Sequence, residues 1–348
     1  MTMDFGFYLP AHWHNMKVHA VHMYREMLTE AKHAEDLGFS SLHIPEHHFL
    51  NYLVHPHPLI TAARVAGETK RIPLVTAVLV LPFYDVRRLA GEIALTDCLT
   101  EGRLEVGVGR GAFLYEFDRF GITVDEGREK FEDSLALLKK LLTEEEVTWD
   151  SKFYKFPALT VLPRPLQQPY PPIWIACVTP PAIYHSAKNG YHVMVMPLRT
   201  TERGPELQAE AFDKARQEGG AKFSRKLAML LFCYVASDRK DAEEKIRLCY
   251  TAQQRFQNAF TTSGDIKGGD IQPNPIDLPI ETFAERVVIG TAEECYEKLK
   301  YFADLGTDEV VLNMNFGADH KDVMGSMERL AKHIMPRLKT DRPKLVVG

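Results

Sequence analysis

The chain has 348 residues, of which 45% are hydrophobic and 26% charged, and its formal net charge is −5 at pH 7. This length fits one large α/β barrel or two smaller domains. The acidic balance is not that of a nucleic-acid-binding protein, and no run approaches the roughly 18 apolar residues that a transmembrane helix needs.

The five cysteines are spread along the chain and never form a CxxC pair. A disulfide framework and a structural zinc site are therefore not expected. The first residues lack the basic and apolar regions of a secretory signal. We expect a cytoplasmic protein with no membrane partner, in which most cysteines are small buried side chains.

Short apolar strands alternate with amphipathic helices along the chain. Because this alternation is typical of a parallel sheet, and because no linker interrupts it, we predict one (β/α)₈ TIM-barrel domain over residues 1–348. Asp97 and Arg103, on either side of a helix–strand turn, are predicted to form an ion pair. The eight expected strands are 4–10, 39–45, 72–82, 104–108, 173–178, 191–196, 226–235 and 309–314. The expected helices cover about 19–37, 58–68, 86–99, 125–142, 179–190, a polar segment ending near 219, 238–259, 291–305 and 320–338.

Two segments interrupt the alternation. Residues 147–172 are rich in proline and have few helical signals, so we expect an excursion of short strands and loop before the fifth strand. Residues 260–280 are rich in Gly, Pro, Asp and Thr and have no apolar period. A structureless segment of this length in a compact domain is often a lid, which here would follow the seventh strand.

A glycine-rich strand end at residues 102–111 is the first chemical signal. There Gly109 precedes Arg110, and Arg128 follows near the start of the next helix. Glycines let the backbone approach a ligand closely, and the planar guanidinium binds phosphate. The pattern fits a phosphate site at the carboxyl end of the strand, and it fits a tight turn with a surface arginine equally well.

The end of the fifth strand offers a second anion site. Cys177 and Val178 lead into Thr179, a plausible N-cap that is followed by proline at the first helical position. Backbone N–H groups at a helix N-terminus bind anions. By itself this feature is only a helix cap, but together with Arg110 and Arg128 it forms a candidate phosphate cradle after strands four and five.

Glu46, His47 and His48 follow the second strand, at the end of a barrel where catalytic residues lie. Histidine can act as acid or base near neutral pH. On this pattern alone, His47 fits a structural role as well as a chemical one, whereas a structural role is favoured for His48.

A metal site was weighed because three further histidines, His43, His55 and His57, lie close by in the sequence. Barrel metal sites draw ligands from several strand ends. The later strand ends provide Asn313 and methionines, which are poor ligands for a hard catalytic metal. We therefore expect no metal.

Several motifs follow one another in a fixed order: Pro-Glu-His-His-Phe at 45–49, the apolar run 76–82, the glycine-rich strand end at 102–111, Glu116-Phe117, Phe120-Gly121, and the late segments 288–294 and 305–310. In order and spacing these motifs resemble the bacterial luciferase-like flavin monooxygenases across nearly the whole chain. The resemblance implies a TIM barrel that binds reduced FMN at its C-terminal face.

By position, the resemblance also assigns roles to residues. His47 corresponds to the family's catalytic histidine, the 260–280 segment to its mobile lid, and the second and third helices to its homodimer interface. The bond between Ala77 and Val78 is expected to be a non-proline cis peptide beneath the flavin ring. The implied cofactor-binding residues are Ala77, Val78, Gly109, Arg110, Arg128, Cys177, Val178 and Thr179.

The activity implied is that of a two-component monooxygenase. A separate NAD(P)H:flavin reductase would supply reduced FMN, O₂ would add at flavin C4a, and the peroxide would transfer one oxygen atom to an organic substrate while His47 steers protons. The substrate would be a small or medium molecule such as an aldehyde, ketone or hydrocarbon. Its pocket is expected to be lined by Tyr8, Phe49, Asn51, Met196 and Asn313.

Two positions depart from the light-emitting α-type of this family. Gly109 stands where that type has a reactive cysteine, and Val178 stands where it has a glutamate. These departures argue against light emission and leave the oxygenase class intact. Two alternatives stay open. One is a deazaflavin-dependent hydride-transfer enzyme, which the Glu46-His47-His48 triplet disfavours. The other is a flavin-binding protein without turnover.

Overall fold

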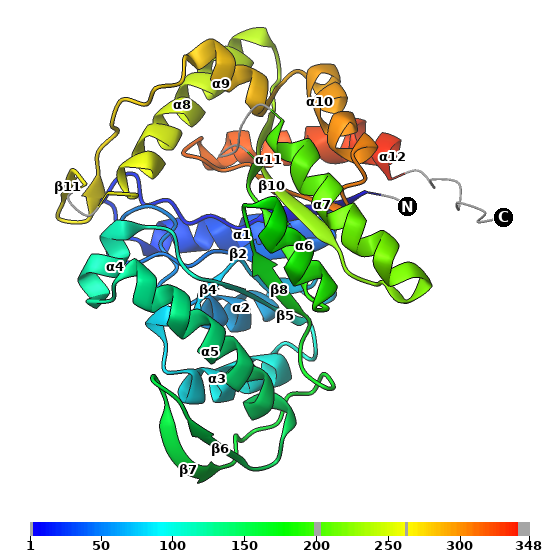
Figure 1. The fold of residues 1–348 in the computed structure, drawn as a ribbon. Helices are drawn as coiled ribbons and strands as arrows, with labels where there is room; N and C mark the ends of the chain where they lie inside the picture. Colours follow the sequence, from blue (N-terminus) through cyan, green and yellow to red (C-terminus); the bar gives the residue numbers. More distant parts are fainter. Residues whose placement is uncertain (1–2, 198–202, 262–263, 340–348) are drawn as a thin grey trace.

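The computed structural model describes residues 3–197, 203–261 and 264–339. Its centre is a closed barrel of parallel strands in the order β10-β14-β1-β2-β3-β5-β8-β9, with β9 pairing back onto β10 (Figure 1). The predicted TIM barrel and its eight strands are therefore confirmed. The strands are β1 (Asp4–Tyr8), β2 (Ser41–Ile44), β3 (Leu74–Thr76), β5 (Leu104–Gly109), β8 (Ile173–Ala176), β9 (His192–Val195), β10 (Leu227–Val235) and β14 (Glu309–Asn313).

Helices surround this barrel, and local sequence signals mark their ends. Helix α1 stops at Gly38, whose φ of 84° suits glycine. Capping boxes begin α5 and α10, in which Thr123 and Thr291 bind the third helical residue. No helix in the described part of the chain is long and apolar enough to span a membrane. The helices are α1 (Val21–Leu37), α2 (Pro58–Ala66), α3 (Val86–Leu99), α4 (Leu114–Phe120), α5 (Val124–Thr143), α6 (Pro180–Lys188), α7 (Gly204–Gly219), α8 (Arg239–Asn258), α9 (Ile280–Arg286), α10 (Ala292–Asp304), α11 (His320–His333) and α12 (Met335–Leu338), with short 3₁₀ turns η1 (Leu81–Phe83) and η3 (Gly220–Lys222).

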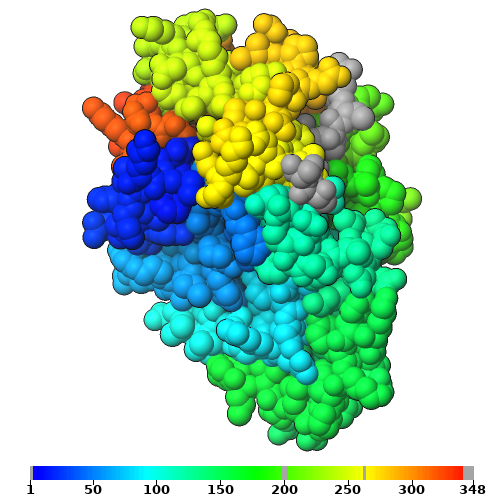
Figure 2. Space-filling view, turned by 90° about the vertical axis from the view of Figure 1, so that its left-hand side faces the viewer, coloured from blue at the N-terminus to red at the C-terminus, as the bar shows by residue number. Residues whose placement is uncertain are grey.

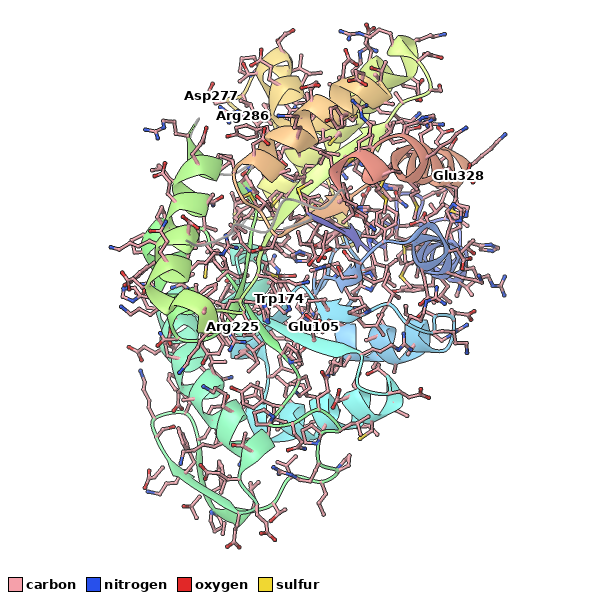
Figure 3. All side chains as sticks on the ribbon, turned by 90° about the vertical axis from the view of Figure 1, so that its right-hand side faces the viewer. Glu105, Trp174, Arg225, Asp277, Arg286 and Glu328 are labelled. Carbon is pink, nitrogen blue, oxygen red and sulfur yellow. The ribbon has the colours of Figure 1, made fainter. Side chains whose placement is uncertain are left out.

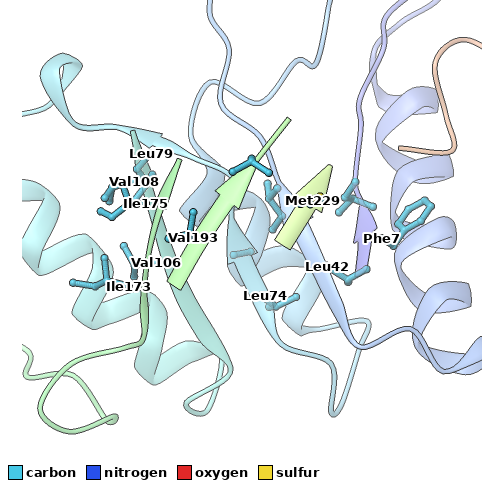
Figure 4. Packing of buried hydrophobic residues seen from close by; sticks show 14 of the residues in the cluster. Phe7, Leu42, Leu74, Leu79, Val106, Val108, Ile173, Ile175, Val193 and Met229 are labelled. Carbon is cyan, nitrogen blue, oxygen red and sulfur yellow. The ribbon is translucent and has the colours of Figure 1, made fainter. Parts of the chain in front are cut away.

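The main hydrophobic core lies between the strands and the helices. On β5, Val106 and Val108 face outward and join Ile173 and Ile175 of β8 in this core (Figure 4). Because side chains alternate along a strand, the intervening residues of β5 face the barrel interior. One of them, Gly107, has no room for a side chain, since an added Cβ would lie 1.9 Å from the Thr76 carbonyl oxygen.

Polar side chains fill the amino-terminal end of the barrel interior. The indole Nε1 of Trp174 donates to Glu105 at 2.6 Å, and the two residues lie side by side in the middle of the molecule (Figure 3). Glu309 is buried beside Ser41 and His43, to which it is hydrogen-bonded. Burial opposes ionisation of Glu309, but the hydrogen bond and charge of His43 and the Ser41 hydroxyl outweigh it and lower its pKa. This layer closes the lower end of the barrel.

The predicted third strand is shorter than expected. It breaks after β3 at the Ala77–Val78 bond, which is cis as the resemblance implied, and resumes as β4 (Leu79–Val80) before η1. A further strand, β13 (Val288–Gly290), was not predicted and pairs with the carboxyl-terminal end of β10. Helices α4 and α9 were also missed, because each has only seven residues.

The proline-rich excursion is confirmed as an antiparallel hairpin of β6 (Val147–Asp150) and β7 (Lys155–Leu159), below α3 and α5 in Figure 1.

The predicted ion pair between Asp97 and Arg103 is wrong, because the chain that follows this hairpin provides another partner for Asp97. Asp97 instead accepts hydrogen bonds from the backbone and side chain of Gln167. Arg103 donates to backbone carbonyls, among them that of Ile72 at 3.2 Å. The sequence neighbours of Asp97 could not reveal a partner 70 residues away.

The segment predicted as a structureless lid contains a small hairpin, β11 (Ile266–Lys267) and β12 (Asp270–Ile271). Its turn consists of Gly268 and Gly269, both at positive φ, a two-residue turn that matches the twist of paired strands. The buried side chain of Asn258 fastens the base of this hairpin, because it bonds the backbone of Asp265 and Gln272. Residues 262 and 263 of the predicted lid lie outside the described residues.

Candidate active site

A small, partly open cavity of about 40 Å³ lies at the carboxyl ends of the barrel strands. None of the larger hollows, of about 330–440 Å³, contains a residue predicted for the site, although one of them shares Leu230 and Phe232 with the small cavity. The chemistry of the lining therefore places the candidate site in the small cavity. Four of its lining residues were predicted, namely Tyr8, His47, Met196 and Asn313, and five were not, namely Tyr52, Leu53, Leu230, Phe232 and Phe256.

His47 is held in one orientation at this cavity. Its Nδ1 lies 3.1 Å from Oε1 of Glu116, and its ring stacks on Phe113 with centroids 4.2 Å apart. The same carboxylate oxygen accepts the backbone N–H of His48 at 2.6 Å, and Glu116 is almost fully buried. A carboxylate at Nδ1 favours the proton on that nitrogen and leaves Nε2 free for a ligand. Glu116 is thus a positioning residue, which sequence reasoning did not single out.

His48 has the structural role that was favoured for it. Its Nε2 lies 2.8 Å from Oε1 of Glu46, whose other oxygen accepts from the Val80 backbone and the Tyr84 hydroxyl. Glu46 is buried and fully used by these contacts. The loop that carries His47 is thereby tied to the chain just after the cis peptide.

The remaining histidines considered for a metal site have separate partners. His43 contacts Ser41 and Glu309 in the barrel interior, and His57 lies 3.1 Å from Glu92. His55 donates from Nε2 to the Leu9 carbonyl and accepts at Nδ1 from the Thr61 hydroxyl, and burial lowers its pKa to about 4. Within residues 3–197, 203–261 and 264–339, no group of three or more His, Cys, Asp or Glu side chains could hold a metal ion.

The glycine-rich end of β5 meets the cis peptide. A Cβ on Gly109 would lie 2.7 Å from a methyl group of Val78. The Val78 side chain therefore packs directly on the backbone of Gly109. The next residue, Arg110, is exposed. It lies near the end of β8, because β5 and β8 are paired with Val108 opposite Ile175. The pKa of the buried Cys177 thiol there is raised, chiefly by burial. The structure therefore brings together the predicted residues of these two strand ends.

The helix start after β8 differs in detail from the prediction. Thr179 is the N-cap of α6, but its hydroxyl makes no capping bond. Prolines at the first two helical positions remove two of the N–H groups that were expected to face an anion. Val178 is exposed, and its carbonyl accepts from Gln208 at 3.0 Å. The exposed hydroxyl of Thr179 remains available to a ligand.

Arg128 is the fifth residue of α5, near the start of this helix as expected, and its side chain is 62% exposed. Its guanidinium is 3.7 Å from the Asp125 carboxylate.

Two residues predicted for the pocket lie outside the cavity lining. Phe49 is 52% exposed, at positive φ, and packs on Phe120. Asn51 instead fastens the lid hairpin: its amide donates to Asp270 at 2.8 Å and accepts from the Ile271 backbone at 3.2 Å. Figure 2 shows the yellow segment that leads into the hairpin seated against the blue N-terminal part of the chain. The hairpin thus covers the mouth of the barrel.

The sequence model of the luciferase-like monooxygenase family matches residues 3–309. The chain belongs to this family. Among luciferase-like relatives, the oxygenase component of the flavin-dependent trigonelline monooxygenase of Acinetobacter baylyi is 29% identical, with 92% of each chain covered. The F420-dependent glucose-6-phosphate dehydrogenase of Beutenbergia cavernae is 28% identical over 90% of this chain and 94% of its own.

Solved luciferase-like structures have the same fold. The monooxygenase RslO1 from Streptomyces bottropensis is 27% identical and superposes with a TM-score of 0.83, over 96% of this chain and 99% of its own. The oxygenating constituent of 3,6-diketocamphane monooxygenase from Pseudomonas putida, solved in complex with FMN, has a TM-score of 0.77 at 18% identity, with 97% and 99% covered. The chain is accordingly an oxidoreductase of the flavin-dependent monooxygenase class.

Proposed function

We propose that the enzyme is the oxygenase component of a two-component cytoplasmic monooxygenase, which uses reduced FMN and O₂ to oxygenate a small or medium organic molecule. The main support is His47, whose ring is locked by Glu116 and Phe113 at the wall of an apolar cavity. A separate NAD(P)H:flavin reductase is the partner that would supply reduced FMN. The name of the relative from Acinetobacter, an oxygenase component, supports this division of labour.

The residues at the ends of β5 and β8 fit a flavin phosphate. The exposed Arg110 and the uncapped hydroxyl of Thr179 would hold the phosphate. The Ala77–Val78 peptide would lie against the ring, and the lack of a side chain on Gly109 lets backbone segments close up there. Arg128 would reach the phosphate from near the start of α5.

Reduced FMN, when bound, supplies the electrons that activate O₂ for transfer of one oxygen atom to the substrate. The chain controls the surroundings of that chemistry. His47 would hold or release a proton at Nε2, because Glu116 occupies its Nδ1. Tyr52, Phe232 and Phe256 exclude water from the cavity, and the hairpin held by Asn51 covers it.

The proposal is tested with a chemically varied substrate panel and a generic flavin reductase. We expect oxygen consumption together with a product heavier by one oxygen atom in the mass spectrum. We also expect tighter binding of reduced than of oxidised FMN. Hydride transfer that depends on F420, a deazaflavin, with no response to FMN, would instead place the enzyme with its F420-dependent relatives. FMN retained through purification without any turnover would indicate a passive binder.

We also propose a homodimer through α2 and α3. These helices expose Ile60, Leu95 and Leu99, and Leu162 and Leu166 of the excursion are exposed as well. Contiguous exposed apolar patches mark interaction surfaces.

A charge on this surface is expected to prevent dimerisation, because it would be buried without a partner in the interface. Leu95→Glu should therefore elute as a monomer in gel filtration at micromolar concentration, whereas the unmodified chain elutes as a dimer. Lys240→Glu, on the exposed start of α8, is the control and should stay dimeric. A monomeric unmodified chain would refute the dimer.

A further inference from the structure

An arginine without a counter-ion lies at the end of α8, the helix whose Phe256 lines the cavity. Arg255 belongs to the last turn of α8 and directly precedes Phe256, which lines the cavity. Its Nε is shielded from solvent and has no hydrogen-bond partner. Within the described residues, no ion pair or hydrogen bond of its guanidinium is found. A half-buried cation of this kind lacks the anion that normally offsets its desolvation.

A buried histidine lies near the same end of α8, because Tyr52 contacts both its ring and that of Phe256, the latter with centroids 5.8 Å apart. His12, in the loop after β1, is more than nine-tenths buried, and its Nε2 has no partner. Its ring stacks on His14, with centroids 5.2 Å apart, and packs against Tyr52 of the cavity wall at 4.9 Å. Buried polar nitrogens in folded proteins are normally hydrogen-bonded, so Nε2 of His12 can take a partner from a bound ligand.

The charge of Arg255 reaches both histidines. Burial, followed by the charges of His14, His55, Arg255 and His47, lowers the pKa of His12 well below its usual range. Partial desolvation and then Arg255 also lower the pKa of His14. At neutral pH the two rings are therefore uncharged, and the N–H of an imidazole is available as a donor beside a fixed positive charge.

The acidic residues of the lid do not neutralise this group. Asp270 accepts hydrogen bonds from Asn51 and Gln272, and Asp265 lies 3.6 Å from Lys267. These carboxylates are used in holding the hairpin. The positive charge of Arg255 is therefore available to an anionic ligand.

The position of His12 separates this group from the predicted phosphate cradle. In the strand order of the barrel, β1 lies four strands from β8 in either direction, so the two are diametrically opposite. His12 follows β1, whereas Thr179 follows β8, and Arg110 ends the neighbouring β5. A flavin whose phosphate lies at β5 and β8 leaves the β1 side of the mouth to a second ligand.

We propose that Arg255, with His12 as a hydrogen-bond donor, binds a carboxylate group of the organic substrate. The substrate class is thus a carboxylic acid in its ionised form. This inference relies on the proposed function only in naming the carboxylate ligand as the substrate.

The test compares carboxylates with amides of the same shape, by calorimetric titration of the full chain with and without saturating FMN. The probes are benzoate with benzamide and octanoate with octanamide. We expect at least one carboxylate to bind about tenfold or more tightly than its amide, as a charge-assisted hydrogen bond provides. In Arg255→Gln this preference should disappear while amide affinity is unchanged, and His12→Phe should lose part of it.

Arg247→Gln is the matched control, since Arg247 lies on the same helix, is exposed and pairs with Glu243. It should keep the full preference. Equal binding of acid and amide, absence of carboxylate binding by the whole panel, or an unchanged preference in Arg255→Gln would overturn the proposal. Weaker FMN binding in Arg255→Gln, without loss of carboxylate binding, would assign the arginine to the flavin phosphate instead.

The same titrations separate this proposal from the proposed function. If the chain prefers carboxylates but never binds FMN, the anion site holds and the flavin assignment fails. If FMN binds and oxygen is consumed while acid and amide bind equally, the proposed function holds and the anion site fails.

Discussion

Replacement of His47 by alanine is expected to lower the rate of substrate oxygenation by about 10²-fold or more, with little change in the affinity for reduced FMN. The loss follows from the removal of a positioned proton donor and acceptor, a contribution of about 10²–10⁴-fold in enzymes. The measurement is product formation by mass spectrometry in single-turnover reactions with pre-reduced FMN. In the same reactions, hydrogen peroxide release should rise as oxygenation falls.

His57→Ala is the matched control for this experiment. His57, like His47, lies in the loop between β2 and α2. It pairs with Glu92 at 3.1 Å and does not line the cavity. Its loss should leave oxygenation unchanged. Full activity of His47→Ala with normal flavin binding would remove His47 from the mechanism.

Replacement of Arg110 by alanine is expected to weaken binding of reduced FMN by about 10- to 100-fold, because a hydrogen bond to a charged group contributes roughly 1.5–3 kcal/mol. Anaerobic titration of the reduced flavin measures this effect. Reduced riboflavin, which lacks the phosphate, should bind the variant and the unmodified enzyme equally well. This comparison isolates the contact between the guanidinium and the phosphate.

Arg64→Ala serves as the control for Arg110, since Arg64 is an exposed arginine that pairs with Glu68 on α2. Its flavin affinity should be unaltered. Equal losses of FMN and riboflavin affinity in Arg110→Ala would show that the residue supports the fold of the loop and does not bind the phosphate.

The barrel could be predicted from the sequence because each strand carries its own signal. The alternation of Val106 and Val108 with small or polar residues on β5 appears in the sequence, and so do the stop at Gly38 and the caps at Thr123 and Thr291. The lid hairpin had a local signal too, the Gly268-Gly269 pair, which was missed. Strand β13, only three residues long, depends on its pairing with β10 and could not be recognised alone.

The candidate site was only partly predictable, for a physical reason. His47 could be found because it follows a strand end, whereas its orientation depends on Glu116, 69 residues later. Phe256 and Arg255 belong to a helix that looks like any other surface helix until its last turn reaches the barrel mouth. Such contacts arise from tertiary packing, and the spacing of residues in the sequence does not predict them.

The polar layer at the bottom of the barrel has a consequence for traffic through the enzyme. Trp174, Glu309 and His43 are almost fully buried there and fill that end of the barrel interior. Substrate and product are therefore expected to pass through the mouth that the hairpin covers. For a rapidly reacting substrate, the turnover rate would then be limited by how often the hairpin opens. Each opening breaks the hydrogen bond between Asn51 and Asp270.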